Sequence, residues 1–416
     1  GLAVGYTYPK ILMERVLPQA QDMVVDDVKK SIFWEPITNM PDSIQGTERE
    51  RLTKAYTDAI QQKVIPTYKK LHDFLRDEYI PKTRTTSGFS DIPEGSEHYK
   101  HLVNFWTTTN LSPDEIFKTG ESEVARIRLE MEKVKNQVGF KGNLKAFFEH
   151  VNTDKKFMPY KTADEVIAGF NAIHEKMGPQ LKMFFNMVPK TGFEVRQTEA
   201  FRAASSSAEY NPGTPDGSRP GIFYVPILDA KTFNYTGMET LFLHEAIPGH
   251  HYQIALQYEN QELPKFRRFL WYGAYGEGWA LYTESLGKEL GLYTDPYQYF
   301  GNLRDEMHRA IRLVVDVGMH AKGWTREQAI KYMMDNEAIS EQSAISEIER
   351  YMAVPAQALS YKIGQLKILE LRKKASDALG EKFNLALFHD EVLKYGCLPL
   401  DVLESIIDEW IEKQRV

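Results

Sequence analysis

Residues 244–251 read HEAIPGHH, and this stretch determines how the rest of the chain is interpreted. A histidine followed by a glutamate, His244-Glu245, opens the familiar H-E-x-x-H zinc motif, in which two histidines on one helix face bind one ion. Here the position four residues after His244 is Pro248, which cannot bind a metal. The second histidine of such a site has to come from further along the chain.

A later histidine can share an ion with His244 only if the helix is interrupted. Seven residues of straight α-helix rise roughly 10 Å, too far for His244 and His251 to bind the same metal. Pro248 lacks a backbone N–H group and Gly249 tolerates unusual backbone angles, so together they can bulge the helix. A bulge of two residues brings in His250 and a larger one brings in His251. We favour His250.

A zinc site also needs a third protein ligand and one open position. Residues 275–284, YGEGWALYTE, offer two carboxylates, Glu277 and Glu284, in a helical pattern. Carboxylates near a helix N-terminus are often surface charges that the helix dipole favours. Aromatic residues crowd this stretch, however, so we expect Glu277 to point inward, where a carboxylate requires a partner. Glu277 is therefore the expected third ligand and Glu284 the alternative, with Glu245 as the general base acting on a zinc-activated water.

The composition is that of an ordinary globular protein, with 416 residues, 42% of them hydrophobic and 26% charged. A net charge of −7 without a basic stripe argues against nucleic acid as a partner. The single cysteine, Cys397, excludes an internal disulfide framework and a cysteine-rich metal site. No run approaches the roughly 18 apolar residues that a transmembrane helix needs. The sequence does not indicate an oligomeric state.

Helical signals dominate the chain. Residues 112–115, SPDE, combine an N-cap, a proline at the first helical position and a capping-box glutamate, which predicts a helix to about Val138. Residues 47–79 also read as helix, with Pro66 as a kink or a boundary. Three further capping boxes are predicted, at Thr162 with Glu165, Thr236 with Glu239, and Thr325 with Gln328.

Residues 244–251 and EGWALY at 277–282 resemble a bacterial family, domain of unknown function 885, whose members are regarded as gluzincin-like metallopeptidases. The resemblance extends over nearly the whole chain, with further matches at 111–116 (LSPDEI), 312–320 (RLVVDVGMH) and 350–364. It implies that His244, one histidine of the 250–251 pair and Glu277 bind zinc, and that Glu245 is the base. More distantly, the lengthened motif is similar to dipeptidyl-peptidase III, and the helical body to carboxypeptidase Taq.

The resemblance also bears on the fold and on localisation. We expect a mainly α, zincin-like metallopeptidase with a small β element before the metal-binding helix. A helical lobe of residues 1–200 and a zinc-binding catalytic lobe of residues 201–416 would together form one large domain. Family members are commonly longer at the N-terminus and some are exported lipoproteins. We therefore expect Gly1 to lie inside a longer parent chain, and the protein to be periplasmic or an exported lipoprotein.

Residues 221–227, GIFYVPI, are the best strand candidate in the chain. They precede the metal helix, as the substrate-aligning edge strand does in zincins, so an extended peptide would pair with residues 222–225. Residues 203–220 are rich in Ser, Asn, Pro and Gly, which predicts a long irregular segment. Within it, residues 204–207 and Tyr210 would line the same groove.

Other side chains are candidates for supporting roles. Tyr361 is our candidate for stabilising the oxyanion, and the alternative is a tyrosine that only packs its helix against the core. Arg312, Asp316 and His320 are spaced to share one helix face. They form an ion-pair ladder, or else Asp316 orients a zinc histidine and His320 donates to the transition state as a catalytic residue.

The sequence therefore predicts a zinc-dependent peptide hydrolase that acts on peptides or oligopeptides in a cleft. Two alternatives remain open. The motif specifies water activation rather than the bond cleaved, so a zinc hydrolase of another amide or ester fits it equally. A helical binding protein with a purely structural metal site is the alternative from a different class.

Overall fold

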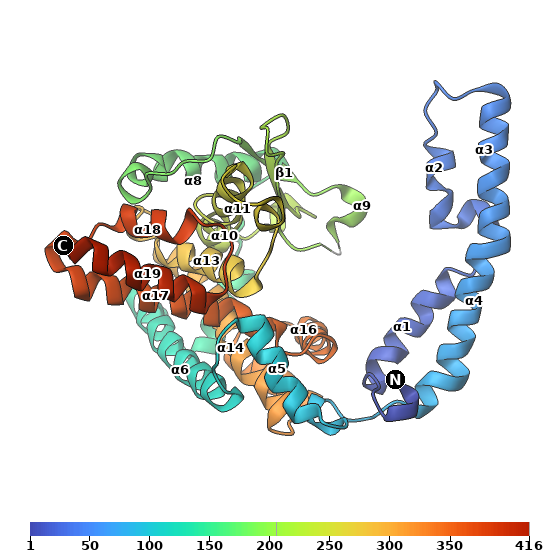
Figure 1. Cartoon of the computed structure of the whole chain (residues 1–416), viewed down its shortest axis with the longest axis horizontal. Coiled ribbons are helices and arrows are strands. Elements are labelled where there is room, and N and C mark those ends of the chain that lie inside the picture. The colour runs from blue at the N-terminus through green and yellow to red at the C-terminus, as the bar shows by residue number, and fades with distance from the viewer. Residues whose placement is uncertain (205, 416) are drawn as a thin grey trace. The chain divides into compact units, whose positions relative to one another are not determined.

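The computed structural model describes residues 1–204 and 206–415, and it is mainly helical with one small sheet (Figure 1). Contacts group the chain into two compact units, Gly1–Ser96 and Glu97–Val416. The division that we expected at residue 200 does not coincide with this boundary, since residue 200 lies inside the second unit. Within the described residues, no helix is both long enough and apolar enough to span a bilayer.

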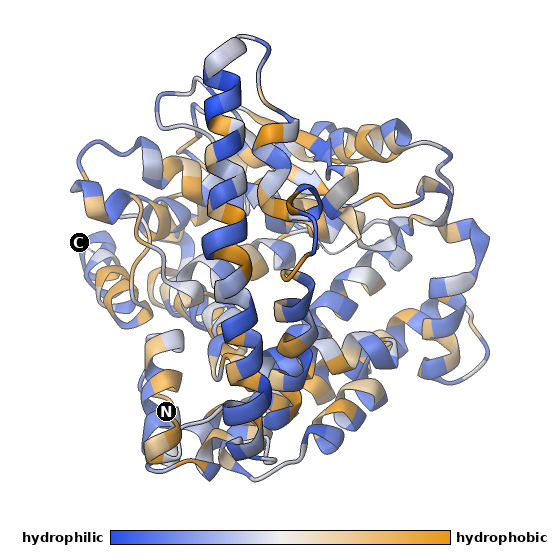
Figure 2. Ribbon diagram, turned by 90° about the vertical axis from the view of Figure 1, so that its right-hand side faces the viewer, coloured by the Kyte–Doolittle hydropathy of each residue, from blue (hydrophilic) through white to orange (hydrophobic). Residues whose placement is uncertain are grey.

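A long, nearly continuous helical stretch dominates the first unit. Its helices are α1 (Lys10–Asp22), α2 (Glu35–Thr38), α3 (Gly46–Ala59) and α4 (Ile65–Phe74), with π-helical turns η4 (Ile60–Val64) and η5 (Leu75–Tyr79). Pro66 lies in the first turn of α4, directly after η4, so the expected boundary at this proline is confirmed. Hydrophobic and hydrophilic residues alternate along this stretch (Figure 2). A small core of Val28, Trp34 and Ile60 is buried in this unit.

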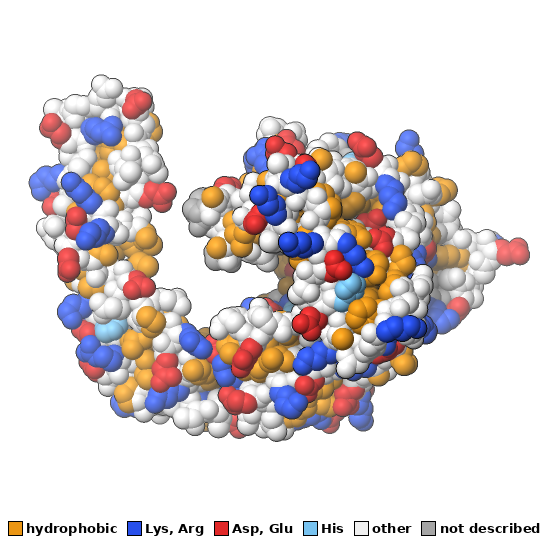
Figure 3. Space-filling model, turned by 180° about the vertical axis from the view of Figure 1, so that it is seen from behind, with side chains coloured by type: hydrophobic (Ala, Val, Ile, Leu, Met, Phe, Trp, Pro, Cys, Tyr) orange, Lys and Arg blue, Asp and Glu red, His pale blue; other side chains and the backbone are white. Residues whose placement is uncertain are grey.

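The second unit holds the other helices and the sheet. Its helices are α5 (Gly95–Thr107), α6 (Pro113–Gln137), α7 (Leu144–Thr153), α8 (Ala163–Phe184), α9 (Ala200–Ala203), α10 (Met238–Glu245), α11 (His250–Glu259), α12 (Lys265–Arg268), α13 (Gly273–Ser285), α14 (Pro296–Ala321), α15 (Arg326–Asn336), α16 (Glu341–Ala353), α17 (Ser360–Leu379), α18 (Leu385–Leu393) and α19 (Leu400–Arg415). The buried α14 packs against α6 and α10, and α8 packs against α10. Residues 97–200 therefore share a core with the C-terminal half, and no boundary falls at residue 200. Basic and acidic side chains are interspersed over the surface (Figure 3).

Local capping signals fixed most of the predicted helix starts. The capping boxes at Ser112 with Glu115 and at Thr325 with Gln328 are formed, and the side chain of Thr162 caps α8 by accepting from the amide of Glu165. The box expected at Thr236 with Glu239 is not formed. Thr236 lies in a 3-10 turn capped by Asn234, and Glu239 instead accepts a hydrogen bond from the amide of Tyr293. Helix α10 therefore begins one residue later than predicted, with Gly237 rather than Thr236 at its N-cap.

The sheet has three strands, β1 (Phe193–Gln197), β2 (Glu209–Asn211) and β3 (Gly221–Val225), in the order β1-β3-β2. The predicted strand is confirmed as β3, but it is not an edge strand. It pairs in parallel with β1 and antiparallel with β2, so neither of its edges is free for a peptide. Strand β2 was not predicted, because it lies inside residues 203–220, which were expected to be irregular. Of the expected groove residues 204–207, residue 205 lies outside the described part of the chain.

Helices α13 and α17 cross at two glycines. A Cβ atom on Gly278 would lie 2.5 Å from the Cα atom of Gly364, and one on Gly364 would lie 1.9 Å from the carbonyl oxygen of Ala274. Both distances are shorter than van der Waals contact. Side chains larger than hydrogen would therefore force the two helices apart.

Gly364→Ala should lower the free energy of unfolding by about 1–3 kcal/mol, the usual cost of overpacking a core. Gly192→Ala is the control, because Gly192 is exposed and a Cβ atom there meets nothing within 4 Å. This control should change the free energy of unfolding by less than about 1 kcal/mol. Urea denaturation followed by circular dichroism measures both, and equal stabilities of the two variants would contradict the close-crossing argument.

Candidate metal centre

The HEAIPGHH stretch breaks one helix into two. Helix α10 ends at Glu245 and α11 begins at His250. Between them the backbone leaves the helical region, at Ala246 (φ −103°, ψ −105°) and at Gly249 (φ −73°, ψ −129°). A Cβ atom on Gly249 would lie 1.9 Å from the carbonyl oxygen of His244, so only glycine fits there. We expected a bulge within a single helix, and the structure instead has a complete break.

Helix α13 stabilises this break by donating hydrogen bonds to backbone carbonyl groups beside it. Trp279 Nε1 donates to the carbonyl oxygen of Pro248 at 2.8 Å, and Thr283 Oγ1 donates to that of Leu243 at 2.9 Å. The last carbonyls of a helix have no partner within the helix, and a buried one is costly if it stays unpaired. The side chains of α13 therefore satisfy the carbonyls that the break leaves behind.

The break brings His250 next to His244 and both next to Glu277. The ligand atoms of these three residues all lie within 4.8 Å of one another. Oε2 of Glu277 is 3.6 Å from Nε2 of His244 and 3.4 Å from Nε2 of His250. Tetrahedral ligands placed about 2.0–2.1 Å from a zinc ion would be about 3.3 Å apart. The two distances to Glu277 fit a zinc ion held by all three residues, and the donor set is one that zinc prefers.

The second paired histidine does not join this group. His251 is buried, and its Nδ1 atom lies 2.9 Å from the hydroxyl of Tyr210. Its ring packs against Phe193 at a centroid distance of 5.3 Å. Burial lowers its pKa to about 4, so the ring is neutral at physiological pH. Of the two candidates, the geometry therefore favours His250.

Buried carboxylates make this centre favourable for positive charge. Burial opposes charge on Glu277 and on His244, but their mutual attraction outweighs it. With help from His250, the pKa of Glu277 is held well below its usual value, and Glu277 and Glu284 raise the pKa of His244. The field at this centre therefore stabilises a cation, which either a proton on the histidines or a metal ion can supply.

Glu284 supports the centre from behind. Its Oε1 atom is 2.7 Å from Nδ1 of His244, which leaves Nε2 directed at Glu277. A carboxylate on the far nitrogen of a zinc histidine orients the ring and makes it a better ligand. The sequence left Glu284 as an alternative ligand, and its spacing of two helical turns from Glu277 was the available signal. Nδ1 of His250 is buried and has no such partner among the described residues.

We had considered Asp316 for this orienting role, and the structure places it elsewhere. Its carboxylate accepts hydrogen bonds from the hydroxyl of Tyr99 at 2.6 Å and from the amide of Ala356 at 3.1 Å. His320, expected to be catalytic, is also fully buried in the core. Its Nε2 atom lies 3.1 Å from the carbonyl oxygen of Tyr351. Asp316 and His320 are therefore buried in the core and are hydrogen-bonded to residues other than the three expected ligands.

A cleft of about 800 Å³ opens onto the centre. It is lined by His244, Glu245, His250 and Glu277, and on its other sides by Tyr210 of β2 and Tyr361 of α17. Glu245 is 8% exposed, and burial raises the pKa of its carboxyl group. The cleft therefore holds the expected base and the expected oxyanion donor together with the three ligands. Arg312 and Arg350 line it as well, and the sequence assigned neither of them to the site.

Comparison with known proteins places the chain in a family. A family profile described as "Bacterial protein of unknown function (DUF885)" matches residues 1–407. The chain is similar to the crystal structure of "the putative lipoprotein from Colwellia psychrerythraea", with a TM-score of 0.91 and 34% identity over 99% of this chain and 72% of that one. It has the fold of "a putative lipoprotein of unknown function from Shewanella oneidensis", with a TM-score of 0.75 and 21% identity over 96% of this chain and 73% of that one. No curated protein matches it.

Zinc content distinguishes the two candidate histidines. His250→Ala removes a donor from the centre and should abolish stoichiometric zinc binding, whereas His251→Ala should retain it because His251 contacts Tyr210 instead. Dialysis against zinc followed by elemental analysis measures the metal bound per chain. Zinc retained by His250→Ala but lost from His251→Ala would reverse the assignment.

Glu284→Gln should weaken zinc binding about 10- to 100-fold, the usual cost of removing the carboxylate behind a zinc histidine. A competition titration with a fluorescent chelator gives the dissociation constant. Glu289→Gln is the control, since Glu289 forms a surface ion pair with Arg372. An unchanged affinity in Glu284→Gln would mean that Glu284 does not act through the metal.

Proposed function

The chain belongs to the DUF885 family of bacterial proteins, and we propose that it is a zinc-dependent peptide hydrolase. The observation that carries this proposal is the gathering of His244, His250 and Glu277 in a cleft that also contains Glu245. Two histidines and one glutamate are the donors of catalytic zinc sites that keep a fourth position open. A purely structural zinc site is normally closed by a fourth protein ligand, so the open cleft favours catalysis.

Zinc bound by these residues would lower the pKa of a water molecule and polarise the scissile carbonyl group. Glu245 takes the proton from the attacking water and passes it to the leaving amine. Because burial raises the pKa of Glu245, its carboxylate is a stronger base than an exposed one. Glu284 keeps the ring of His244 in the orientation that binding requires.

The hydroxyl group of Tyr361 donates a hydrogen bond to the oxyanion that forms on the attacked carbonyl. Its side chain lines the cleft, and the guanidinium carbon of Arg312 lies 4.7 Å from the centre of its ring. Burial raises the pKa of Tyr361, so the phenol keeps the proton that this hydrogen bond needs. The guanidinium of Arg312 makes a cation–π interaction with the ring face, which carries a partial negative charge.

The shape of the cleft supports an extended peptide as the substrate. Its volume of about 800 Å³ lies within the usual range for ligand-binding pockets. Glu209 and Tyr210 of β2 line it, and β2 is an edge strand. A peptide can therefore add to the sheet along β2, rather than along β3 as the sequence suggested. In this proposal, the sheet, the His-Glu helix α10 and helix α13 with Glu277 would correspond to the strand and the two helices of a zincin.

For localisation, the proposal follows the similar Colwellia psychrerythraea protein. Because that protein is described as a lipoprotein, we propose that this chain also belongs to a lipoprotein and that it is exported. Its substrates would then be peptides outside the cytoplasm.

Glu245→Gln should retain zinc and lose roughly 10²- to 10⁴-fold in peptide hydrolysis, because the amide cannot accept the proton. Cleavage of an oligopeptide library by mass spectrometry and elemental analysis of zinc are measured on the same samples. Glu289→Gln should behave as wild type in both assays.

Three results would reject the proposal. Full peptide hydrolysis by Glu245→Gln would exclude Glu245 as the base. A wild-type protein that holds zinc and cleaves esters or other amides, but no peptide, would support the alternative zinc hydrolase. A wild-type protein with no turnover of any of these would indicate a binding protein.

A further inference from the structure

Two arginines face the cleft beside the expected oxyanion donor. Arg312 comes from α14 and Arg350 from α16, and both line the cleft that holds the three ligands. Arg312 is only 8% exposed, whereas Arg350 is partly open to solvent. The guanidinium carbon of Arg312 lies 4.7 Å from the ring centre of Tyr361, which lines the same cleft. A group bound at the arginines would therefore share the cleft with the expected oxyanion donor and the three expected ligands.

The two guanidinium groups share one carboxylate. Glu347 is the carboxylate between the two, 3.3 Å from Nη2 of Arg312 and 3.1 Å from Nη2 of Arg350. Guanidinium groups stay charged at any physiological pH, so one carboxylate faces two cations. Nη2 of Arg312 also lies 3.1 Å from Nε2 of His308, whose Nδ1 atom is 2.9 Å from Glu337. The two guanidinium groups therefore meet at the single carboxylate of Glu347 on this wall of the cleft.

The two guanidinium groups also have donors to spare. Arg312 donates from Nε to the hydroxyl of Tyr351, while Arg350 donates from Nη1 to the side chain of Gln357. Both donate from Nη2 to Glu347. Each guanidinium has five N–H groups, and among the described residues Nη1 of Arg312 and Nε of Arg350 make no hydrogen bond. Poorly hydrated cations with unused donors are suited to binding an anion.

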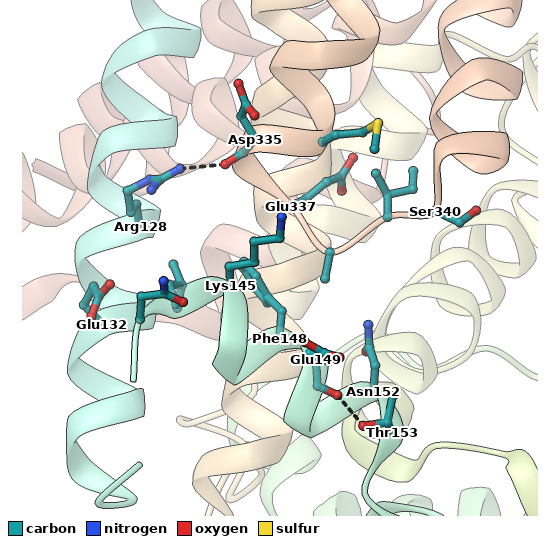
Figure 4. A pocket seen from close by; sticks show the side chains of 15 residues that line it. Arg128, Glu132, Lys145, Phe148, Glu149, Asn152, Thr153, Asp335, Glu337 and Ser340 are labelled. Atoms are coloured by element: carbon teal, nitrogen blue, oxygen red, sulfur yellow. Dashed lines mark hydrogen bonds between the residues drawn. The ribbon is translucent and has the colours of Figure 1, made fainter. Parts of the chain in front are cut away.

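Other charged groups do not offer the same arrangement. Arg309 also lines the cleft, but it lies 3.7 Å from its own carboxylate, Asp305. A second cleft, of about 620 Å³, lies among α6, α7 and the segment that joins α15 to α16 (Figure 4). Its lining includes Arg128 and Lys145 but also Glu132, Glu149, Asp335 and Glu337. Arg128 is the one arginine in that lining, so this cleft lacks a pair of guanidinium groups that could bind a carboxylate together.

We propose that Arg312 and Arg350 bind a carboxylate group of the substrate. This inference rests on the proposed function, because it places the carboxylate on a peptide whose scissile bond lies at the metal centre. The carboxylate is either the free C-terminus of a short peptide or an acidic side chain near the scissile bond. Both present the same pair of oxygens to a guanidinium fork.

Binding to zinc-loaded Glu245→Gln protein tests the inference without requiring turnover. Isothermal titration calorimetry compares three peptides: acetyl-Ala-Ala-Phe with a free carboxylate, the same peptide as its carboxamide, and acetyl-Ala-Glu-Phe carboxamide. The free acid or the glutamate peptide should bind roughly 10- to 100-fold more tightly than the neutral carboxamide, as expected for hydrogen bonds to charged groups. Tight binding of the acid alone identifies the C-terminus, and tight binding of the glutamate peptide identifies a side chain.

Variants in the same Glu245→Gln background separate the arginines from zinc, which also attracts carboxylates. Arg350→Gln should remove most of the preference, and Arg350→Lys should restore part of it by returning the charge without the planar fork. Arg372→Gln, which breaks a surface ion pair with Glu289, should leave the preference intact. Thermal melting checks that each variant is folded.

Equal binding of all three peptides, or a preference that Arg350→Gln leaves unchanged, would overturn the inference. Neither result depends on catalysis, so the loss of hydrolysis in Glu245→Gln remains a separate test of the proposed function.

Discussion

The break between α10 and α11 is the constraint on which the candidate site depends. A continuous helix would carry its histidines along one axis, with His244 and His250 on different turns. The break ends α10 directly after Glu245, and α11 starts with His250. The ring centres of His244 and His250 are then 4.8 Å apart. This arrangement leaves backbone carbonyls without helical partners in the core of the protein. It is stable because side chains of α13 donate hydrogen bonds to two of them.

Helix α13 consequently has two functions in the same few turns. Trp279 and Thr283 hydrogen-bond to the carbonyl groups at the break. They lie between Glu277 and Glu284, which contact His244. Its glycine at 278 lets α17 approach closely, and α17 carries Tyr361 into the cleft. The ligands, the carboxylate behind them and the expected oxyanion donor are thus positioned by helices in direct contact. Such rigidity is what a preorganised catalytic site requires.

Electrostatics divides the cleft into two regions. At one end, Glu245, Glu277 and Glu284 concentrate negative charge in a largely buried place, which is costly unless a cation offsets it. At the other end, Arg312 and Arg350 share the carboxylate of Glu347. Tyr361 lines the same cleft and packs against the guanidinium of Arg312. A peptide with a polarised carbonyl and a nearby carboxylate is complementary to this distribution.

The sequence by itself determined the features that depend on neighbouring residues. Capping residues such as Ser112 set helix starts, and β3 followed from its run of β-branched and aromatic residues. Pro248-Gly249 predicted a distortion of the helix next to His244 and Glu245, although not the complete break. The aromatic surroundings of Glu277 predicted that its carboxylate points inward, where it lies near His244 and His250. These are local signals, and local chemistry is sufficient to read them.

Only the tertiary structure decided which distant residues meet. It placed His250 rather than His251 beside Glu277, put Glu284 behind His244, buried His320 in the core and covered the free edge of β3 with β2. It also brought Arg312 and Arg350 together across two helices. Each outcome depends on the packing of segments that are far apart in the chain. Spacing along the sequence carries no information about that packing, because it is set by the shapes of the faces that each helix buries.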